Sequence, residues 1–144
     1  DLARCCAELG GFSLDFSHLP FPLGYLPKVF TFETVEFIGV YGDVLFSGDG
    51  LVTAGQIEIN KTWIPATVKL DLAMLPCHVC RIEADVYGRG PEARMEAQTL
   101  GAGIQTAVCP GDKVTLTLTT SPDHPFTSVK LSGSEAIWYS IRIQ

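Results

Sequence analysis

Hydrophobic and polar residues alternate one by one along much of the chain, most regularly in its second half. A period of two places successive side chains on opposite faces of a β-strand. The pattern predicts half-buried strands at Thr67–Leu72, Arg81–Tyr87, Lys113–Thr119 and Ala136–Ile143.

The first half shows the same pattern in shorter pieces. Phe12–Phe16 alternates, and Val29–Phe37 is interpreted as one strand. Val40–Phe46 and Leu51–Thr53 flank Ser47-Gly48-Asp49-Gly50, whose residues favour a tight turn, so we expect a hairpin there.

Two further segments complete the pattern. Ala93–Thr99 is polar enough to predict an edge strand, and Ile104–Val108 predicts another short strand. About ten short strands at regular spacing, without a convincing long helix, are typical of sandwiches and barrels. The sequence therefore predicts an all-β fold with little or no helix. We expect a two-sheet antiparallel β-sandwich of the jelly-roll kind, forming a single domain over residues 1–144.

The closing segment Ala136–Ile143 has two unlike faces. Strict alternation predicts that one face points into the core, and it consists of Ile137, Tyr139, Ile141 and Ile143. Trp138 and Arg142 would then lie on the outer face, where packing does not explain a tryptophan.

Composition narrows the class of protein. The chain has 144 residues, of which 47% are hydrophobic and 18% charged, which argues against disorder. Its net charge is −6 with only 10 Lys and Arg, so it lacks the cationic surface that nucleic-acid binding needs. No apolar run approaches the roughly 20 residues of a membrane helix. Because the chain begins at Asp1, we expect a processed chain or a piece of a longer protein.

The chain contains five cysteines, four of which fall in two close pairs. Cys5 and Cys6 are adjacent, and Cys77 and Cys80 have the spacing of a zinc knuckle or redox pair. The favoured hypothesis is one or two disulfides that tie the N-terminal segment to the 77–80 loop. Reduced buried thiols and a metal site remain as alternatives.

From about Thr67 to Ile143 the chain resembles the galactose-binding-like jelly-roll domains found in carbohydrate-binding modules. The resemblance is carried by Val68–Leu72, by "IEADVYGRG" from Ile82, and by "FTSVKLSGSEAIWYSIRI" from Phe126. It implies a domain that binds glycans, often with a structural calcium ion, in an extracellular or secreted protein.

Several residues could form a glycan site. Sugar C–H faces stack on aromatic rings, while charged side chains bind hydroxyl groups. The candidate ligand-binding residues are Trp138, Arg142, Tyr87, Trp63, Glu83 and Asp85. Alternatively, Trp138 lies under a loop or against a second copy of the domain.

Three functions follow from these observations. The first is a non-catalytic binding module for a carbohydrate or similar polar ligand. The second is a structural or assembly domain that contacts copies of itself or a protein partner. The third is a small hydrolase, although the chain has no Gly-x-Ser-x-Gly or His-Glu-x-x-His motif. Acidic residues in turns, such as Asp49 and Asp112, are candidate calcium ligands.

Overall fold

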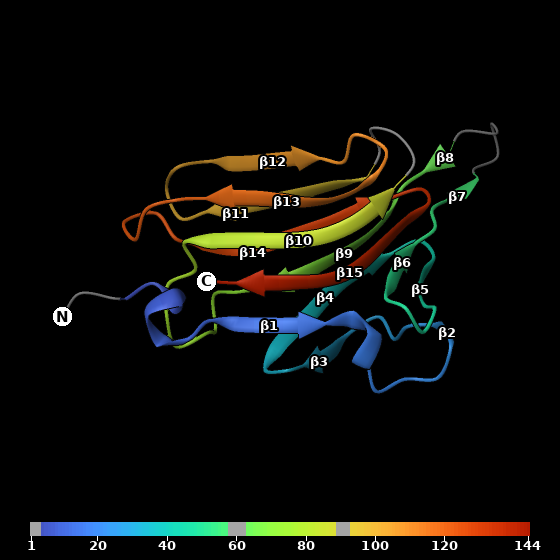
Figure 1. The fold of residues 1–144 in the computed structure, drawn as a ribbon, viewed down its shortest axis with the longest axis horizontal. Helices are drawn as coiled ribbons and strands as arrows, with labels where there is room; N and C mark the ends of the chain where they lie inside the picture. The colour runs from blue at the N-terminus through green and yellow to red at the C-terminus, as the bar shows by residue number, and fades with distance from the viewer. Residues whose placement is uncertain (1–3, 58–62, 89–92) are drawn as a thin grey trace.

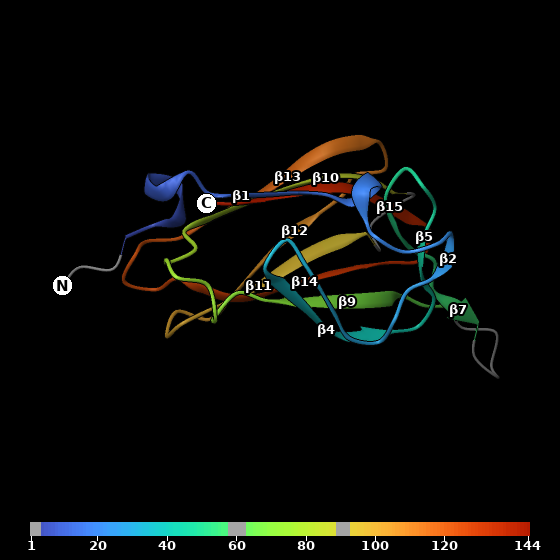
Figure 2. The same ribbon diagram turned by 90° about the horizontal axis from the view of Figure 1, so that it is seen from below.

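The computed structural model describes residues 4–57, 63–88 and 93–144. Within them, two antiparallel sheets face each other as a β-sandwich, which confirms the predicted fold class (Figures 1 and 2). The jelly-roll arrangement stays a prediction.

The first sheet has seven strands in the order β13-β10-β15-β6-β5-β2, with β1 also paired to β15. Its strands are β1 (Phe12–Asp15), β2 (Gly24–Tyr25), β5 (Val44–Phe46), β6 (Leu51–Thr53), β10 (Arg81–Gly88), β13 (Lys113–Thr119) and β15 (Ala136–Ile143). The closing strand β15 lies in the interior of the sheet, because it pairs with β1, β10 and β6.

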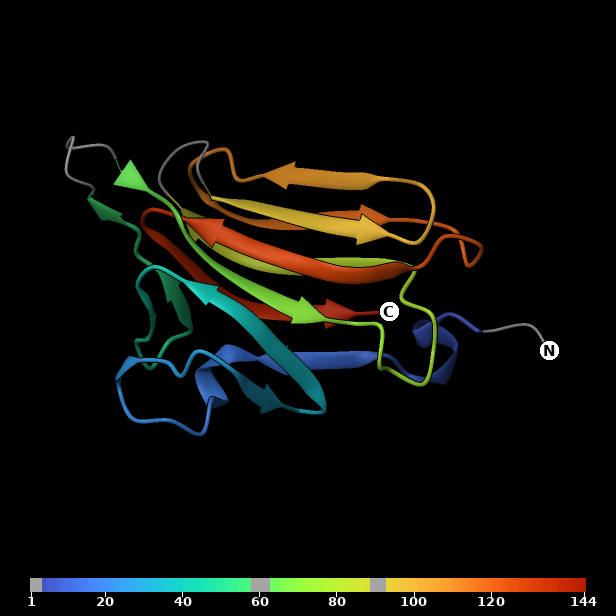
Figure 3. The same cartoon turned by 180° about the vertical axis from the view of Figure 1, so that it is seen from behind.

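The second sheet has six strands in the order β12-β11-β14-β9-β4-β3, and Figure 3 shows it in front. Its strands are β3 (Phe30–Phe32), β4 (Val35–Tyr41), β9 (Ala66–Asp71), β11 (Arg94–Thr99), β12 (Ile104–Val108) and β14 (Phe126–Gly133). A separate short pair consists of β7 (Gln56–Ile57) and β8 (Trp63–Ile64).

Helical structure in the described part of the chain consists of two 3-10 turns, η1 (Cys6–Leu9) and η2 (Phe16–His18). No helix among these residues is long and apolar enough to cross a membrane.

The core lies between the two sheets and is built from their inward-facing apolar side chains. Its largest fully buried side chains include Trp138, Phe16, Phe37 and Phe126. Phe37 stacks on Phe30 with ring centroids 4.5 Å apart and meets Phe16 edge-on at 6.0 Å. This aromatic group joins η2 to the hairpin β3–β4 and closes one side of the sandwich.

The single strand predicted for Val29–Phe37 is wrong, because the chain turns in its middle. Glu33 and Thr34 adopt positive φ angles of 52° and 68°, and they connect β3 to β4 as a hairpin. Two consecutive left-handed residues make the tight connection that matches strand twist. No residue type in the segment marks this turn, because such turns usually carry glycine or asparagine.

The prediction of an edge strand at Ala93–Thr99 is also wrong. The strand β11 lies between β12 and β14, so both of its edges are hydrogen-bonded. Its inward side chains Met95 and Ala97 are fully buried. The polar residues that suggested an edge instead point outward from an interior strand.

A β-bulge in β15 overturns the predicted faces of the closing strand. Asp85 pairs with Ser140 but the next residue, Val86, pairs with Trp138, so Tyr139 has no partner on β10. The extra residue reverses the alternation beyond it. Ile141 and Ile143 point inward as predicted, whereas Ile137 and Tyr139 are half-buried and Trp138 takes the inward position.

Candidate functional site

The outer face of the seven-stranded sheet carries the charged and aromatic side chains of β10. Alternate residues of this strand are buried, and those between them point outward: Arg81, Glu83, Asp85 and Tyr87. Arg142 reaches the same face, because it pairs with Glu83 across β10 and β15. The structure therefore brings together four of the predicted binding residues, namely Arg142, Tyr87, Glu83 and Asp85.

Arg142 is the centre of a group of ion pairs on this face, which we call the Arg142 cluster (Arg81, Glu83, Asp85 and Arg142). Its two terminal nitrogens donate to the carboxylate of Asp85 at 3.0 and 3.2 Å. Its Nε donates to Glu83 at 3.4 Å, and Arg81 donates to the other oxygen of Glu83 at 3.0 Å. Two donors in a planar fork fix the orientation of a carboxylate, so the cluster is ordered.

Two hydroxyl groups complete the environment of Asp85. Thr115 on β13 donates to Oδ1 at 2.6 Å, and Ser140 on β15 donates to Oδ2 at 2.9 Å. The hydrogen bonds from Arg142, and then those from Thr115 and Ser140, hold the pKa of Asp85 well below its usual range despite partial burial. The pKa of Glu83 is lowered as well, chiefly by Arg81.

These low pKa values decide what the cluster can do chemically. A general acid needs a raised pKa, whereas Glu83 and Asp85 are held as anions. They also lie on one strand and share one arginine, rather than facing each other across a cleft as glycosidase carboxylates do. Their side chains remain 20% and 30% exposed. Both oxygens of Asp85 already accept two hydrogen bonds each, whereas each oxygen of Glu83 accepts one. Glu83 therefore keeps lone pairs that can accept hydrogen bonds from hydroxyl groups of a ligand.

Beside the Arg142 cluster, an apolar row crosses the same face. The pairing of the strands places five residues side by side, one from each strand, and they are Tyr25, Leu45, Val52, Ile137 and Tyr87. Strands lie about 4.8 Å apart, so five of them span roughly 19 Å. Tyr25 and Tyr87, at the two ends of the row, are 73% and 37% exposed.

Lys113 on β13 extends the row beyond Tyr87, with which it pairs. Its Nζ lies 4.4 Å from the ring centroid of Tyr139, in a cation–π contact that passes over β10. Tyr139 is the bulged residue of β15. The bulge therefore brings a third tyrosine to this face, between the apolar row and the Arg142 cluster.

The expectation that Trp138 lies on the outer face is wrong. Its side chain is fully buried, and its Nε1 donates to the hydroxyl of Thr53 at 3.2 Å inside the core. A partner for the indole N–H is what a buried tryptophan requires. Trp138 supports the sheet from within and cannot contact a ligand on the outer face.

Trp63, the remaining candidate ligand-binding residue, belongs to β8 and pairs with Ile57. Its side chain lies outside the described part of the structure, as do residues 58–62 that precede it.

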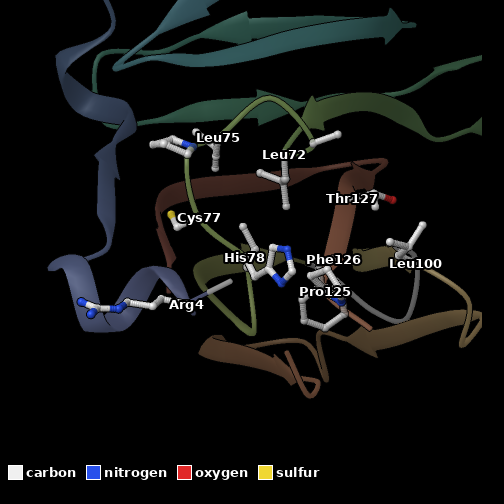
Figure 4. A pocket seen from close by; sticks show the side chains of 12 residues that line it. Arg4, Leu72, Leu75, Cys77, His78, Leu100, Pro125, Phe126 and Thr127 are labelled. Atoms are coloured by element: carbon white, nitrogen blue, oxygen red, sulfur yellow. The ribbon is translucent and has the colours of Figure 1, made fainter. Parts of the chain in front are cut away.

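Sequence reasoning missed a cavity of about 560 Å³ at the end of the sandwich opposite the apolar row. It opens between the loop that joins β9 to β10, the loop after β11 and the start of β14. Figure 4 shows the ring of His78 among apolar side chains, while Arg4 extends away from it. Its residues are scattered over distant segments, so no local pattern in the sequence marks the cavity.

The disulfide hypothesis is confirmed by the structure. Cys5 is bonded to Cys80 and Cys6 to Cys77, which ties η1 to the loop beside the cavity. The remaining cysteine, Cys109, is free and fully buried.

Calcium binding stays a prediction. In the described part of the chain, no three His, Cys, Asp or Glu side chains gather into a group that could hold an ion. Calcium prefers six to eight oxygen ligands, and candidates such as Asp49 and Asp112 lie in separate turns.

Comparison with known proteins shows no family for this chain. The sequence matches no protein-family model and no curated protein. Among solved structures it is similar to BiXyn10A CBM1 in its apo form, with 9% identity over 93% of this chain and 96% of that chain. The TM-score is 0.48, and a likeness at this level carries no argument.

Proposed function

We propose that this chain is a non-catalytic binding domain that takes a carbohydrate, or a similar polar ligand with an apolar face, on the outer face of its seven-stranded sheet. The observation that carries the proposal is the register of that sheet. It aligns the apolar row beside the Arg142 cluster, so that stacking surface and fixed charges share one face.

The two parts of this face suit the two kinds of surface that a sugar presents, its apolar C–H groups and its hydroxyl groups. The rings of Tyr25 and Tyr87 offer exposed surface to C–H groups. The carboxylate of Glu83 is a fixed acceptor for hydroxyl donors, because Arg81 and Arg142 hold it in place. Since the cluster is ordered before a ligand arrives, binding loses little side-chain entropy.

The proposal is tested by screening the domain on a glycan array and then measuring the affinity of each hit by calorimetry. We expect Tyr87→Ala to weaken binding about tenfold, which is the loss of about 1.4 kcal/mol of contact. Tyr41→Ala is the matched control, because Tyr41 is 52% exposed on β4 of the other sheet. Equal effects of the two substitutions, or no hit on the array from folded protein, would contradict the proposal.

A second candidate function is assembly, and the apolar row is the observation that favours it. Exposed apolar surface on one sheet face is typical of protein contacts. Light scattering over a range of concentrations distinguishes the two: a dimer that Tyr25→Glu dissociates supports self-assembly, and a strict monomer excludes it.

The two disulfides agree with an extracellular or secreted location, because such bonds persist in oxidising compartments. Secretion would also expose the domain to glycans of cell surfaces or of extracellular polymers.

A further inference from the structure

The cavity at the disulfide end of the sandwich has the size and lining of a small-molecule site. Its volume of about 560 Å³ lies within the roughly 300–1,000 Å³ of ligand pockets. Leu72, Val79 and Phe126 are at most 2% exposed and form its apolar floor. Leu100, which is 60% exposed, lies at its rim.

The walls of the cavity are fixed by covalent and hydrogen bonds. Cys77 lines the cavity and is bonded to Cys6. The backbone of His78 donates to the carbonyl of Arg4 at 2.8 Å and accepts from Cys6 at 2.7 Å. On the other side, Phe126 donates to the carbonyl of Val79 at 2.8 Å. A cavity held in this way is formed before a ligand arrives.

One ring nitrogen of His78 forms a hydrogen bond within the protein, and the other can bond to a ligand. Its Nδ1 lies 3.0 Å from the carbonyl oxygen of Pro122. Because a carbonyl only accepts, Nδ1 carries the proton and Nε2 is left with a lone pair in the neutral ring. No described residue forms a hydrogen bond with Nε2.

The charges around the cavity differ from those of the chain as a whole. The lining residues include no acidic side chain, although the net charge of the chain is −6. Of the two basic side chains among them, Arg4 extends away from the cavity and the ring of His78 lies among its apolar side chains. A ligand with a negative or proton-donating group is favoured at this place over a cation.

We propose that this cavity binds a small apolar carboxylic acid, with its hydrocarbon body against Leu72 and Phe126 and its carboxyl group at Nε2 of His78. One proton is shared between Nε2 and the carboxyl oxygen, whichever of the two carries it. The site is separate from the outer face of the seven-stranded sheet, because it lies beyond the Arg81 end of β10 whereas Tyr87 is at the other end.

The test is a titration of the ¹⁵N-labelled domain with 3-phenylpropionate, followed by NMR, beside the same titration with its neutral amide. We expect saturable shifts at the amides of Leu72, Val79 and Thr127, with a Kd of about 1 mM or lower for the acid. The amide is expected to bind at least tenfold more weakly. This comparison uses the unaltered protein, so it does not depend on any variant folding.

Three substitutions then locate the site. His78→Gln keeps a donor for the carbonyl of Pro122 but removes the basic nitrogen. Leu100→Trp places a larger ring at the rim of the cavity. Each substitution is expected to raise the Kd for the acid at least tenfold. His18→Gln is the control, because the side chain of His18 is 78% exposed on η2 and does not line the cavity. The proposal is overturned by the absence of shifts from the acid, by equal binding of acid and amide, or by full binding to both His78→Gln and Leu100→Trp.

Discussion

At the scale of single residues, Trp138 shows how a β-bulge changes the role of a neighbouring side chain. Strict alternation from Ile143 would place it outside, where it would be a ligand contact. Because Tyr139 is bulged, Trp138 instead fills the core and bonds to Thr53. The same bulge moves Tyr139 to the outer face, beneath Lys113.

Trp138→Ala is therefore expected to act on stability. Removing a buried aromatic side chain leaves a cavity and lowers the free energy of unfolding by about 3–5 kcal/mol. Tyr25→Ala, at a position 73% exposed, should change it by less than about 0.5 kcal/mol. Urea unfolding of the two variants measures both values, and similar midpoints would contradict the burial of Trp138.

Asp85 links the outer face to the pH dependence of stability. Its pKa is lowered in the folded state, mainly by Arg142, so the folded protein binds a proton there less readily than the unfolded chain. Its contribution is complete above the unfolded pKa of about 3.9 and is lost as pH falls below that value. The lowered pKa of Glu83 acts in the same direction.

We expect the free energy of unfolding to fall with pH below about 4, and to fall less steeply in Asp85→Asn. Denaturant unfolding at a series of pH values gives the two slopes. Asp49→Asn, at an exposed turn position, is the control and should follow the unaltered protein. Identical slopes for Asp85→Asn and the unaltered protein would show that the Arg142 cluster does not stabilise the fold.

At the scale of elements, the turn of the hairpin β3–β4 consists of residues that disfavour its left-handed conformation. Thr34 has a φ of 68°, and a β-branched residue in the left-handed region is strained by about 1–2 kcal/mol. The hairpin forms nevertheless, because Phe30, Phe32, Val35 and Phe37 are all buried on its inner side. Packing of these four side chains outweighs the local preference of the turn.

Thr34→Gly is expected to stabilise the protein by about 0.5–1 kcal/mol, because relief of strain exceeds the entropy lost by fixing a glycine. Thr31→Gly is the contrast, since Thr31 lies within β3, where glycine weakens a strand. Thermal unfolding gives both shifts in Tm, and a lower Tm for Thr34→Gly would contradict the strained turn.

At the scale of the whole molecule, two disulfides join segments that are far apart in sequence. They link residues separated by 75 and 71 positions, and they run side by side. The C-terminus meets the same region, because Gln144 accepts hydrogen bonds from the backbones of Cys80 and Arg81. The two ends of the chain and the cavity therefore share one stabilised end of the sandwich.

The two disulfides are expected to stabilise the fold non-additively. Closing a loop of about 75 residues removes about 4.5 kcal/mol of entropy from the unfolded chain. When one bond is present, the other closes only a ring of about six residues, worth about 2 kcal/mol. Replacing either pair by serine should thus destabilise by about 2 kcal/mol, and replacing both by more than the sum, as measured by denaturant unfolding.

The sequence by itself determined the fold class and most of the strands. The alternation along the chain predicted the bounds of β13 and β15, and those of β10 to within one residue, because a period of two is typical of a β-strand. In β10 it also placed Glu83, Asp85 and Tyr87 on one face. The spacing of Cys77 and Cys80, beside the adjacent Cys5 and Cys6, was enough to favour disulfides.

Only the tertiary structure decided what depends on contacts between distant segments. The bulge at Tyr139 is set by pairing with β10, and the turn at Thr34 by burial of its neighbours. The apolar row exists only once five strands are in register, and the cavity beside His78 only once separate loops meet. A local sequence pattern indicates which side of a sheet a residue favours, whereas strand pairing and packing decide on which side it lies.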